Sequence, residues 1–139
     1  MRRVALVACL LAVPGLAACG GDDTEDARQA AEGYVQRLGK RDGAGTCGQM
    51  TEQLQQQFLR AAVRTNAEFR GRNCAQVMQA ALDSIAPSQL RQFSNAKIED
   101  VKIDGDKGTF RYTLDQIRVD GQVAKEDGDW KVSCCVPGQ

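Results

Sequence analysis

The pattern of apolar residues changes once along this chain, and the change falls after Asn95. Before it, apolar residues recur at spacings of three and four, as on one face of an α-helix. After it, apolar and polar residues alternate, as in half-buried strands, and Asp-Gly pairs interrupt the alternation at short intervals. Helices followed by strands in a chain of 139 residues predict one α+β domain, with the helices packed on one face of a sheet.

Three helices are expected in the first part. The first begins at Thr24, and the stretch Asp42-Gly43-Ala44-Gly45 ends it. The second opens with Thr51, and the third is capped by Asn73 and ends before Pro87. The apolar faces of the three helices are Ala27, Ala30, Ala31, Tyr34, Val35 and Leu38; Leu54, Phe58, Ala61, Ala62 and Phe69; and Cys74, Met78, Ala81, Leu82 and Ile85.

Four strands are expected in the second part. Short turns rich in Asp and Gly join them, so they predict an antiparallel meander. The third strand is short and polar, which is typical of an edge strand. The expected strands are 97–103, 109–119, 122–126 and 130–136, with turns at 104–108, 120–121 and 127–129.

Charge and composition exclude several classes of function. The 18 basic and 18 acidic residues balance, which gives no reason to expect a nucleic-acid partner. The chain has no histidine, which removes Ser-His-Asp and Cys-His catalysis and the commonest metal ligand. We therefore expect no metal site and no cofactor, and any enzyme here would have to use Asp, Glu, Tyr, Lys or Cys.

The N-terminal segment has the layout of an export signal. Residues 1–3 are positively charged, ten apolar residues follow at 4–13, and Pro14 interrupts them. A membrane-spanning helix needs about 20 apolar residues, so this run is too short for one. The segment LAAC, which ends in Cys19, resembles the lipobox of bacterial lipoproteins. In that motif the cysteine sulfur is acylated with diacylglycerol and the chain is cut just before it.

The lipobox resemblance implies three segments: a cleaved signal peptide at 1–18, the lipidated Cys19 with a tether at 19–23, and a domain at 24–136. The tether spans at most about 14 Å, so we expect the domain at the extracytoplasmic face of the cell membrane. Without residues 1–18 the chain has 16 basic and 18 acidic residues, and no polybasic patch is expected to help it bind anionic lipid. The alternative is an ordinary signal cleaved after Ala18.

Four sequence features resemble small bacterial lipoproteins with a nuclear transport factor 2-like domain. They are AxxAAxxYVxxL in the first helix, Asp42 followed by Cys47, a third helix led by Cys74, and the terminal KEDGDWKV. The resemblance implies a cone of helices wrapped by a strongly curved antiparallel sheet, which usually encloses a pocket. The superfamily includes isomerases, dehydratases and polyketide cyclases, and also members that only bind ligands or partners, so the fold does not decide the function.

Five residues are candidates for the lining of such a pocket. In the catalytic branch that resembles ketosteroid isomerase, an Asp base faces Tyr and protonated Asp donors. Each candidate also has a structural interpretation, which we prefer: the aromatic residues as core and the aspartate as a turn residue. We therefore assign no catalytic residue. The candidates are Tyr34, Phe58, Tyr112, Asp115 and Trp130.

Four cysteines remain after the signal and the lipid site. Cys47 and Cys74 are expected to pair, because each begins a short helical element beside the second helix and because the resemblance implies this disulfide. Cys134 and Cys135 are adjacent, and a relaxed strand points their thiols to opposite faces. A strained vicinal bridge, one buried and one exposed thiol, and pairing with another chain all remain open for them.

The function expected from these features is a lipid-anchored, non-enzymatic binding or interaction module of the cell envelope. Its partners would be the membrane, through the lipid, and a small apolar ligand or an envelope protein; the oligomeric state is open. Two alternatives are a small cofactor-free isomerase or cyclase of the same fold, and a thiol-based redox sensor that uses Cys134 and Cys135.

Overall fold

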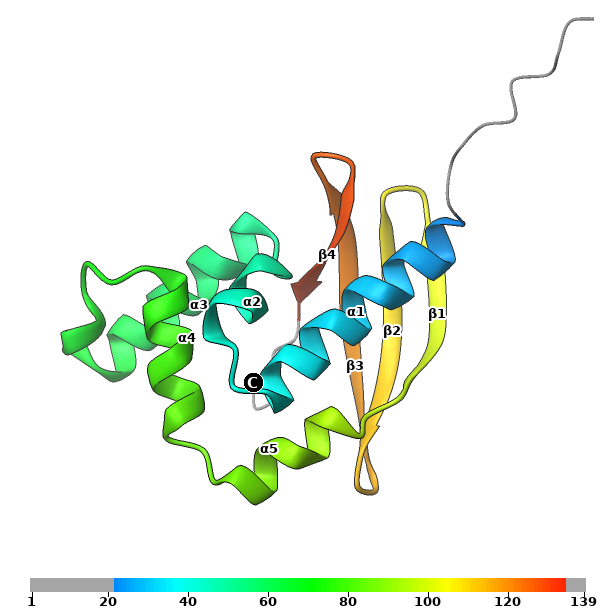
Figure 1. Cartoon of the computed structure of the whole chain (residues 1–139). Coiled ribbons are helices and arrows are strands. Elements are labelled where there is room, and N and C mark those ends of the chain that lie inside the picture. Colours follow the sequence, from blue (N-terminus) through cyan, green and yellow to red (C-terminus); the bar gives the residue numbers. More distant parts are fainter. Residues whose placement is uncertain (1–21, 135–139) are drawn as a thin grey trace, which may run out of the picture.

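Residues 22–134 are described by a computed structural model, and helices precede strands along them (Figure 1). This order confirms the α+β class. The helices are α1 (Asp23–Gly39), α2 (Gly43–Gly48), α3 (Glu52–Thr65), the short 3-10 helix η1 (Ala67–Phe69), α4 (Cys74–Asp83) and α5 (Pro87–Ser94). The strands are β1 (Ile98–Asp104), β2 (Lys107–Leu114), β3 (Ile117–Glu126) and β4 (Asp129–Cys134).

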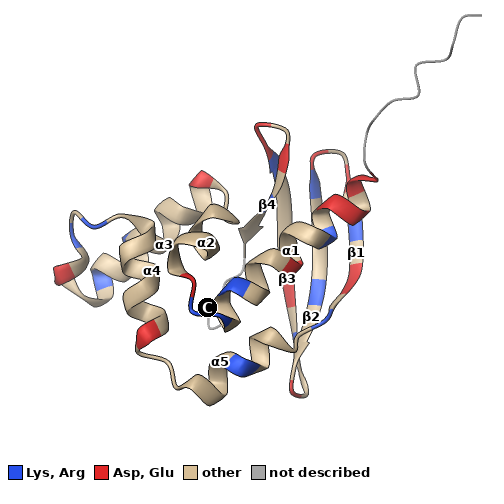
Figure 2. Cartoon of the chain, in the orientation of Figure 1, with Lys and Arg blue, Asp and Glu red and all other residues tan. Residues whose placement is uncertain are grey.

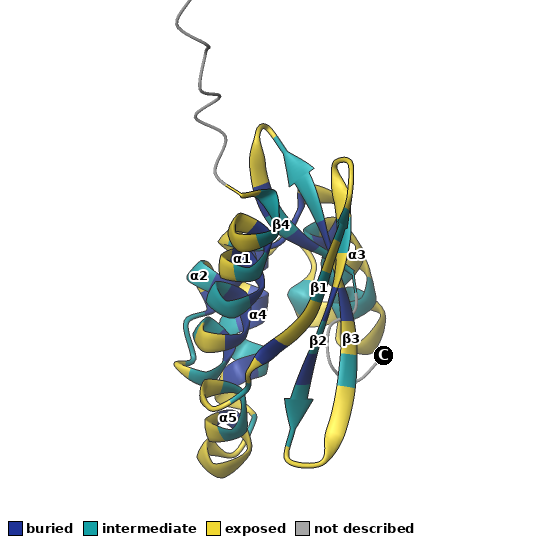
Figure 3. Cartoon of the chain, turned by 90° about the vertical axis from the view of Figure 1, so that its right-hand side faces the viewer, coloured by how far each residue is buried: buried dark blue, intermediate teal, exposed yellow. Residues whose placement is uncertain are grey.

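The four strands form one antiparallel sheet in the order β1-β2-β3-β4, which confirms the meander. Helices α1, α2, α4 and α5 lie together on one side of this sheet (Figure 3). Helix α3 packs against α4, η1 and the edge strand β4. Helix α1 covers one face of the sheet. The opposite face is largely polar, with Thr109, Arg111 and Thr113 on β2.

The core lies between α1 and the covered face of the sheet. Every residue predicted for the apolar face of the first helix is buried, from Ala27 to Leu38. In β2, Phe110 and Tyr112 point to the same face and are 2% and 1% exposed, as the alternation predicts. The apolar periods therefore identified the contributions of α1 and β2 to the core correctly. Of the face predicted for the second helix, only Leu54 is buried, and Phe69 lies in η1.

The structure has five α-helices in residues 22–134, where the sequence predicted three. The stretch Asp42-Gly43-Ala44-Gly45 was expected only to end the first helix. It instead opens α2, because the Asp42 side chain accepts a hydrogen bond of 2.8 Å from the Gly45 amide and caps a new helix. Pro87, expected to follow the last helix, instead occupies the first turn of α5. Proline is tolerated there because amide groups of the first turn have no partner within the helix.

Two predicted strands were also divided at the wrong place. The chain turns at Asp115, which has a φ of 54°, and not at Gly121. Gly121 lies inside β3 opposite Phe110, whose ring occupies the space that a side chain at 121 would need. As a result β3 is the ten-residue interior strand Ile117–Glu126, and the prediction of a short edge strand was wrong.

The outer edge of β4 is paired with the segment that joins α2 to α3. The Thr51 amide donates to the Val132 carbonyl at 2.9 Å, and the Val132 amide donates to the Gln49 carbonyl at 2.8 Å. Met50 and Val132 thereby form a parallel bridge, and both are fully buried. This bridge attaches the helical layer, including α2, to the edge of the sheet.

Candidate functional site

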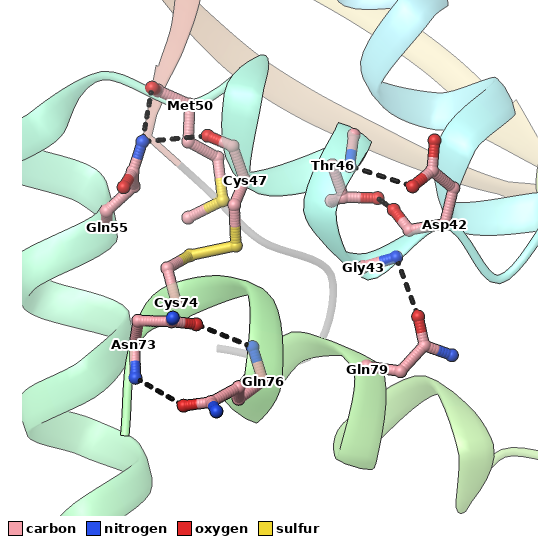
Figure 4. Close-up of a disulfide and its surroundings, with 11 residues drawn as sticks. Asp42, Gly43, Thr46, Cys47, Met50, Gln55, Asn73, Cys74, Gln76 and Gln79 are labelled. Carbon is pink, nitrogen blue, oxygen red and sulfur yellow. Dashed lines mark hydrogen bonds between the residues drawn. A yellow bond between two sulfur atoms is a disulfide. The ribbon is translucent and has the colours of Figure 1, made fainter. Parts of the chain in front are cut away.

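Cys47 in α2 and Cys74 at the start of α4 form a disulfide, which confirms the predicted pair (Figure 4). Their α-carbons are 6.1 Å apart, and both residues are buried. Cys74 begins its helix as expected, whereas Cys47 lies near the end of α2. The bridge therefore joins the two short helices on either side of α3.

Polar side chains close both helix ends around this disulfide. Asn73 and Gln76 form a reciprocal capping box at the start of α4, with contacts of 2.9 and 3.1 Å. Gln55 donates through Nε2 to the carbonyl oxygens of Cys47 and Met50 at 2.8 and 3.2 Å. Figure 4 shows these groups surrounding the two sulfur atoms. The backbone polar groups near the bridge are thus satisfied by side chains, and these contacts have a structural role.

Asp42 caps α2, the helix that carries Cys47. The Gly45 amide and the Arg37 guanidinium, each 2.8 Å away, hold the pKa of the Asp42 carboxyl below its usual value. The Gly43 amide donates to Oε1 of Gln79 on α4 at 3.1 Å. Because the carboxylate of Asp42 is already shared between a helix N-terminus and an arginine, its contacts are those of a helix cap.

Tyr34 of α1 and Tyr112 of β2 lie in the core, each 1% exposed. Neither hydroxyl has a hydrogen-bond partner among the described residues. Burial raises the pKa of both phenols, and the proximity of Tyr112 adds to the rise for Tyr34. The Tyr112 ring is stacked near Phe110, with centroids 6.1 Å apart. Two protonated phenols therefore lie in an apolar layer, without a carboxylate beside them.

The other three pocket candidates lie elsewhere. Asp115 is exposed in the β2–β3 turn and lines an open hollow of about 450 Å³ with residues of α5, among them Arg91. Phe58 is half-buried on α3 and packs against the edge of the core. Trp130 is buried, and its indole nitrogen donates to Asp23 at 3.2 Å. The structure therefore brings Tyr34 and Tyr112 into one layer and separates Asp115 from them, and a pocket lined by all five remains a prediction.

The contact between Asp23 and the β3–β4 hairpin was missed by the sequence analysis. Lys125 forms an ion pair of 2.8 Å with Asp23 and lies over the Trp130 ring, 5.4 Å from its centroid. Lys125 and Trp130 together lower the pKa of the Asp23 carboxyl. No local pattern predicts a contact between residues that lie over one hundred positions apart, although KEDGDWKV contains two of the three partners.

Two of the predicted cysteine sites fall outside the described residues, namely Cys19 and Cys135. Cys134 ends β4, is half-buried and is disulfide-bonded. Its bond involves neither Cys47 nor Cys74, since these two bond each other. A redox function of this pair remains a hypothesis.

Within residues 22–134 we find no cluster of three or more acidic or cysteine side chains placed to hold a metal ion. In the same residues, none of the helices has the length and apolar character needed to cross a membrane. No family model matches this chain, and no curated protein or solved structure is significantly similar to it.

Proposed function

We propose that this chain is a lipid-anchored binding module on the outer face of a bacterial cell membrane, without catalytic activity. Cys19 would carry the lipid, and residues 24–136 would form a domain of the nuclear transport factor 2-like type. The meander of four strands with α1 across one face supports this fold at the level of its architecture. The sequence of the LAAC segment supports the anchor.

The observation that carries the proposal is the Cys47–Cys74 disulfide. Disulfides persist in oxidising compartments and are rare where glutathione and thioredoxin keep thiols reduced. The bridge is buried and surrounded by satisfied caps, so it belongs to the folded domain and is not an accidental surface contact. A structural disulfide and an export signal are independent features, and both favour a location outside the cytoplasm.

The arrangement of the candidate residues supports binding over catalysis. A general acid and a general base must face the same bound substrate, each within about 3 Å of the atom that it protonates or deprotonates. Here the exposed carboxylate of Asp115 and the buried phenols of Tyr34 and Tyr112 occupy different parts of the domain. The two phenols are protonated and lie in the packed core, so neither is placed to exchange a proton with a bound substrate.

Replacement of the lipidated sulfur tests this proposal. Cys19→Ser should fold as the parent does and should move from the membrane fraction to the soluble extracytoplasmic fraction. Mass spectrometry of the parent should find diacylglycerol on an N-terminal Cys19 peptide. Cys9→Ser removes a sulfur from the predicted signal and should leave both results unchanged. If Cys19→Ser remained in the membrane fraction after signal cleavage, or if the parent peptide carried no lipid, the proposal would be wrong.

A further inference from the structure

Basic residues gather where α3 ends and the chain turns toward α4. We call residues 59–73 the basic corner. Residues 22–134 carry 16 basic and 18 acidic side chains. The basic corner contains four of these basic residues, all arginines, and one acidic residue, a glutamate. The other described residues contain 12 basic and 17 acidic side chains. Figure 2 shows this basic group at the side of the molecule opposite the start of α1. A chain with almost no net charge is therefore strongly polarised in space. The four arginines are Arg60, Arg64, Arg70 and Arg72.

The charge of the basic corner is not neutralised within the protein. All four arginines are exposed, and none of them takes part in the six ion pairs found between described side chains. The sole ring contact among them is that of Arg72 with Phe69, at 5.8 Å. Outside the corner, Arg28, Arg37 and Arg111 each pair with a carboxylate, whereas Arg91 and Arg118 are exposed and have no ion pair but lie singly on separate elements. Unpaired guanidinium groups in this number indicate an anionic partner.

Apolar side chains lie between the arginines. Leu59, Val63 and Phe69 are half-buried and line an open hollow of about 380 Å³, with Arg60, Arg64 and Arg72 at its rim. Of the fourteen residues of α3, just Leu54 is buried. Helix α3 is therefore amphipathic, but it covers little of the protein with its apolar face. Basic residues around partly exposed apolar ones are typical of surfaces that bind anionic lipid.

We propose that the basic corner binds the anionic phospholipid surface of the membrane that carries the domain. This inference rests on the proposed lipid anchor, because Gly20, Gly21 and Asp22 alone separate Cys19 from α1. A tether of this length keeps the start of α1 within about 14 Å of the lipidated cysteine. The membrane is then the one anionic surface that is always within reach, and a second contact held at high effective concentration is effective even when weak.

The distribution of charge would orient the domain. The start of α1 is acidic, with Asp22, Asp23, Glu25 and Asp26, and an anionic surface repels it while the tether holds it there. The basic corner at the opposite side is attracted, so the domain would lie with its long direction along the membrane (Figure 1). No polybasic patch was expected from the sequence. The local charge of the corner was hidden because acidic residues elsewhere cancel it in the total.

Vesicle sedimentation tests the inference on the domain without its lipid. The chain without residues 1–18 and with Cys19→Ser is mixed with vesicles of phosphatidylglycerol and phosphatidylcholine, and separately with phosphatidylcholine alone. We expect binding to the first and not to the second. Each arginine near an anionic surface contributes about fivefold, so Arg60→Gln with Arg64→Gln should lower the partition coefficient about 25-fold. Arg91→Gln with Arg118→Gln makes the same charge change at two exposed arginines that have no ion pair, and should leave binding within about twofold.

Three outcomes would overturn the inference. The first is equal binding to both vesicle types, or none to either. The second is an equal loss in both double variants, which would mean that total charge decides binding and the corner does not. The third is binding of soluble polyglutamate, abolished by Arg60→Gln with Arg64→Gln, with no binding to vesicles, which would assign the corner to an acidic polypeptide. Because the domain lacks the lipid, these results are independent of the Cys19→Ser fractionation, and each proposal can fail alone.

Discussion

Asp23 accepts a hydrogen bond of 3.2 Å from the indole nitrogen of Trp130, which lies 107 positions further along the chain. The first residue of α1 is thereby attached to the β3–β4 hairpin, where Lys125 also reaches it. This contact determines where α1 begins relative to the sheet. In the proposed lipoprotein it would therefore also determine where the tether leaves the domain.

The Asp23 contact predicts sensitivity to acid. Because Lys125 and Trp130 lower the pKa of Asp23 in the folded state, the unfolded state takes up its proton first as the pH falls. The stabilisation is present above the usual pKa of an aspartate, about 3.9, and is lost as the pH falls through the lowered value. Asp23→Asn should therefore show a shallower fall of Tm below pH about 4 than the parent.

Asp26→Asn is the control for this measurement, since Asp26 lies on the same helix and its side chain accepts no hydrogen bond from the other described groups, although its charge also acts on Lys125. Its Tm should follow the parent as the pH falls. Equal slopes for the parent and Asp23→Asn would show that the ion pair contributes nothing to acid stability.

The buried phenols predict an unusual response to substitution. A buried hydroxyl without a partner costs roughly 1–3 kcal/mol, whereas a hydrogen-bonded one stabilises by about 1 kcal/mol. Tyr34→Phe and Tyr112→Phe should therefore leave the free energy of unfolding unchanged or raise it, as measured with urea. Tyr34→Leu, which also removes packing, should lower it by about 1–3 kcal/mol. A loss of about 1 kcal/mol or more in the Phe variants would show that a water molecule or a ligand bonds to the hydroxyls.

The Cys47–Cys74 bridge closes a loop with a sequence separation of 27. The loss of chain entropy in the unfolded state predicts that Cys47→Ser with Cys74→Ser lowers the free energy of unfolding by about 3.5 kcal/mol. Dithiothreitol should destabilise the parent to a similar level. Any further effect of the reductant on the double variant measures the bond of Cys134. A loss below about 1 kcal/mol in the double variant would contradict the prediction.

Apart from the Cys47–Cys74 pair, the residues placed correctly from the sequence are those whose pattern arises within one element. The three and four residue spacing from Ala27 to Leu38 and the alternation of Phe110 with Tyr112 follow from the geometry of one element, and both were predicted. Gly121 was wrongly assigned to a turn. Position 121 must be glycine because the Phe110 ring on the neighbouring strand occupies the space of a side chain, and no local pattern reveals this contact. The candidate site shows the same limit of local patterns. Asp115 is close to Tyr112 in the sequence, but the chain turns at Asp115, which is exposed while Tyr112 is buried in the core.

The close approach of α2 to α4 gives the last prediction. A β-carbon on Gly43 would lie 2.6 Å from the backbone nitrogen of Gln79 and 2.8 Å from its α-carbon, and backbone atoms cannot move aside as a flexible side chain does. Gly43→Ala should therefore push α2 from α4, strain the adjacent disulfide region and lower the free energy of unfolding by about 1–3 kcal/mol. Gly48, at the other end of α2, has no atom within 4 Å of such a β-carbon. Gly48→Ala should instead stabilise the protein by up to about 1 kcal/mol, because alanine is the better helix former. Urea unfolding of both variants separates the two effects, and a Gly43→Ala variant as stable as Gly48→Ala would show that the two helices can move apart at no cost.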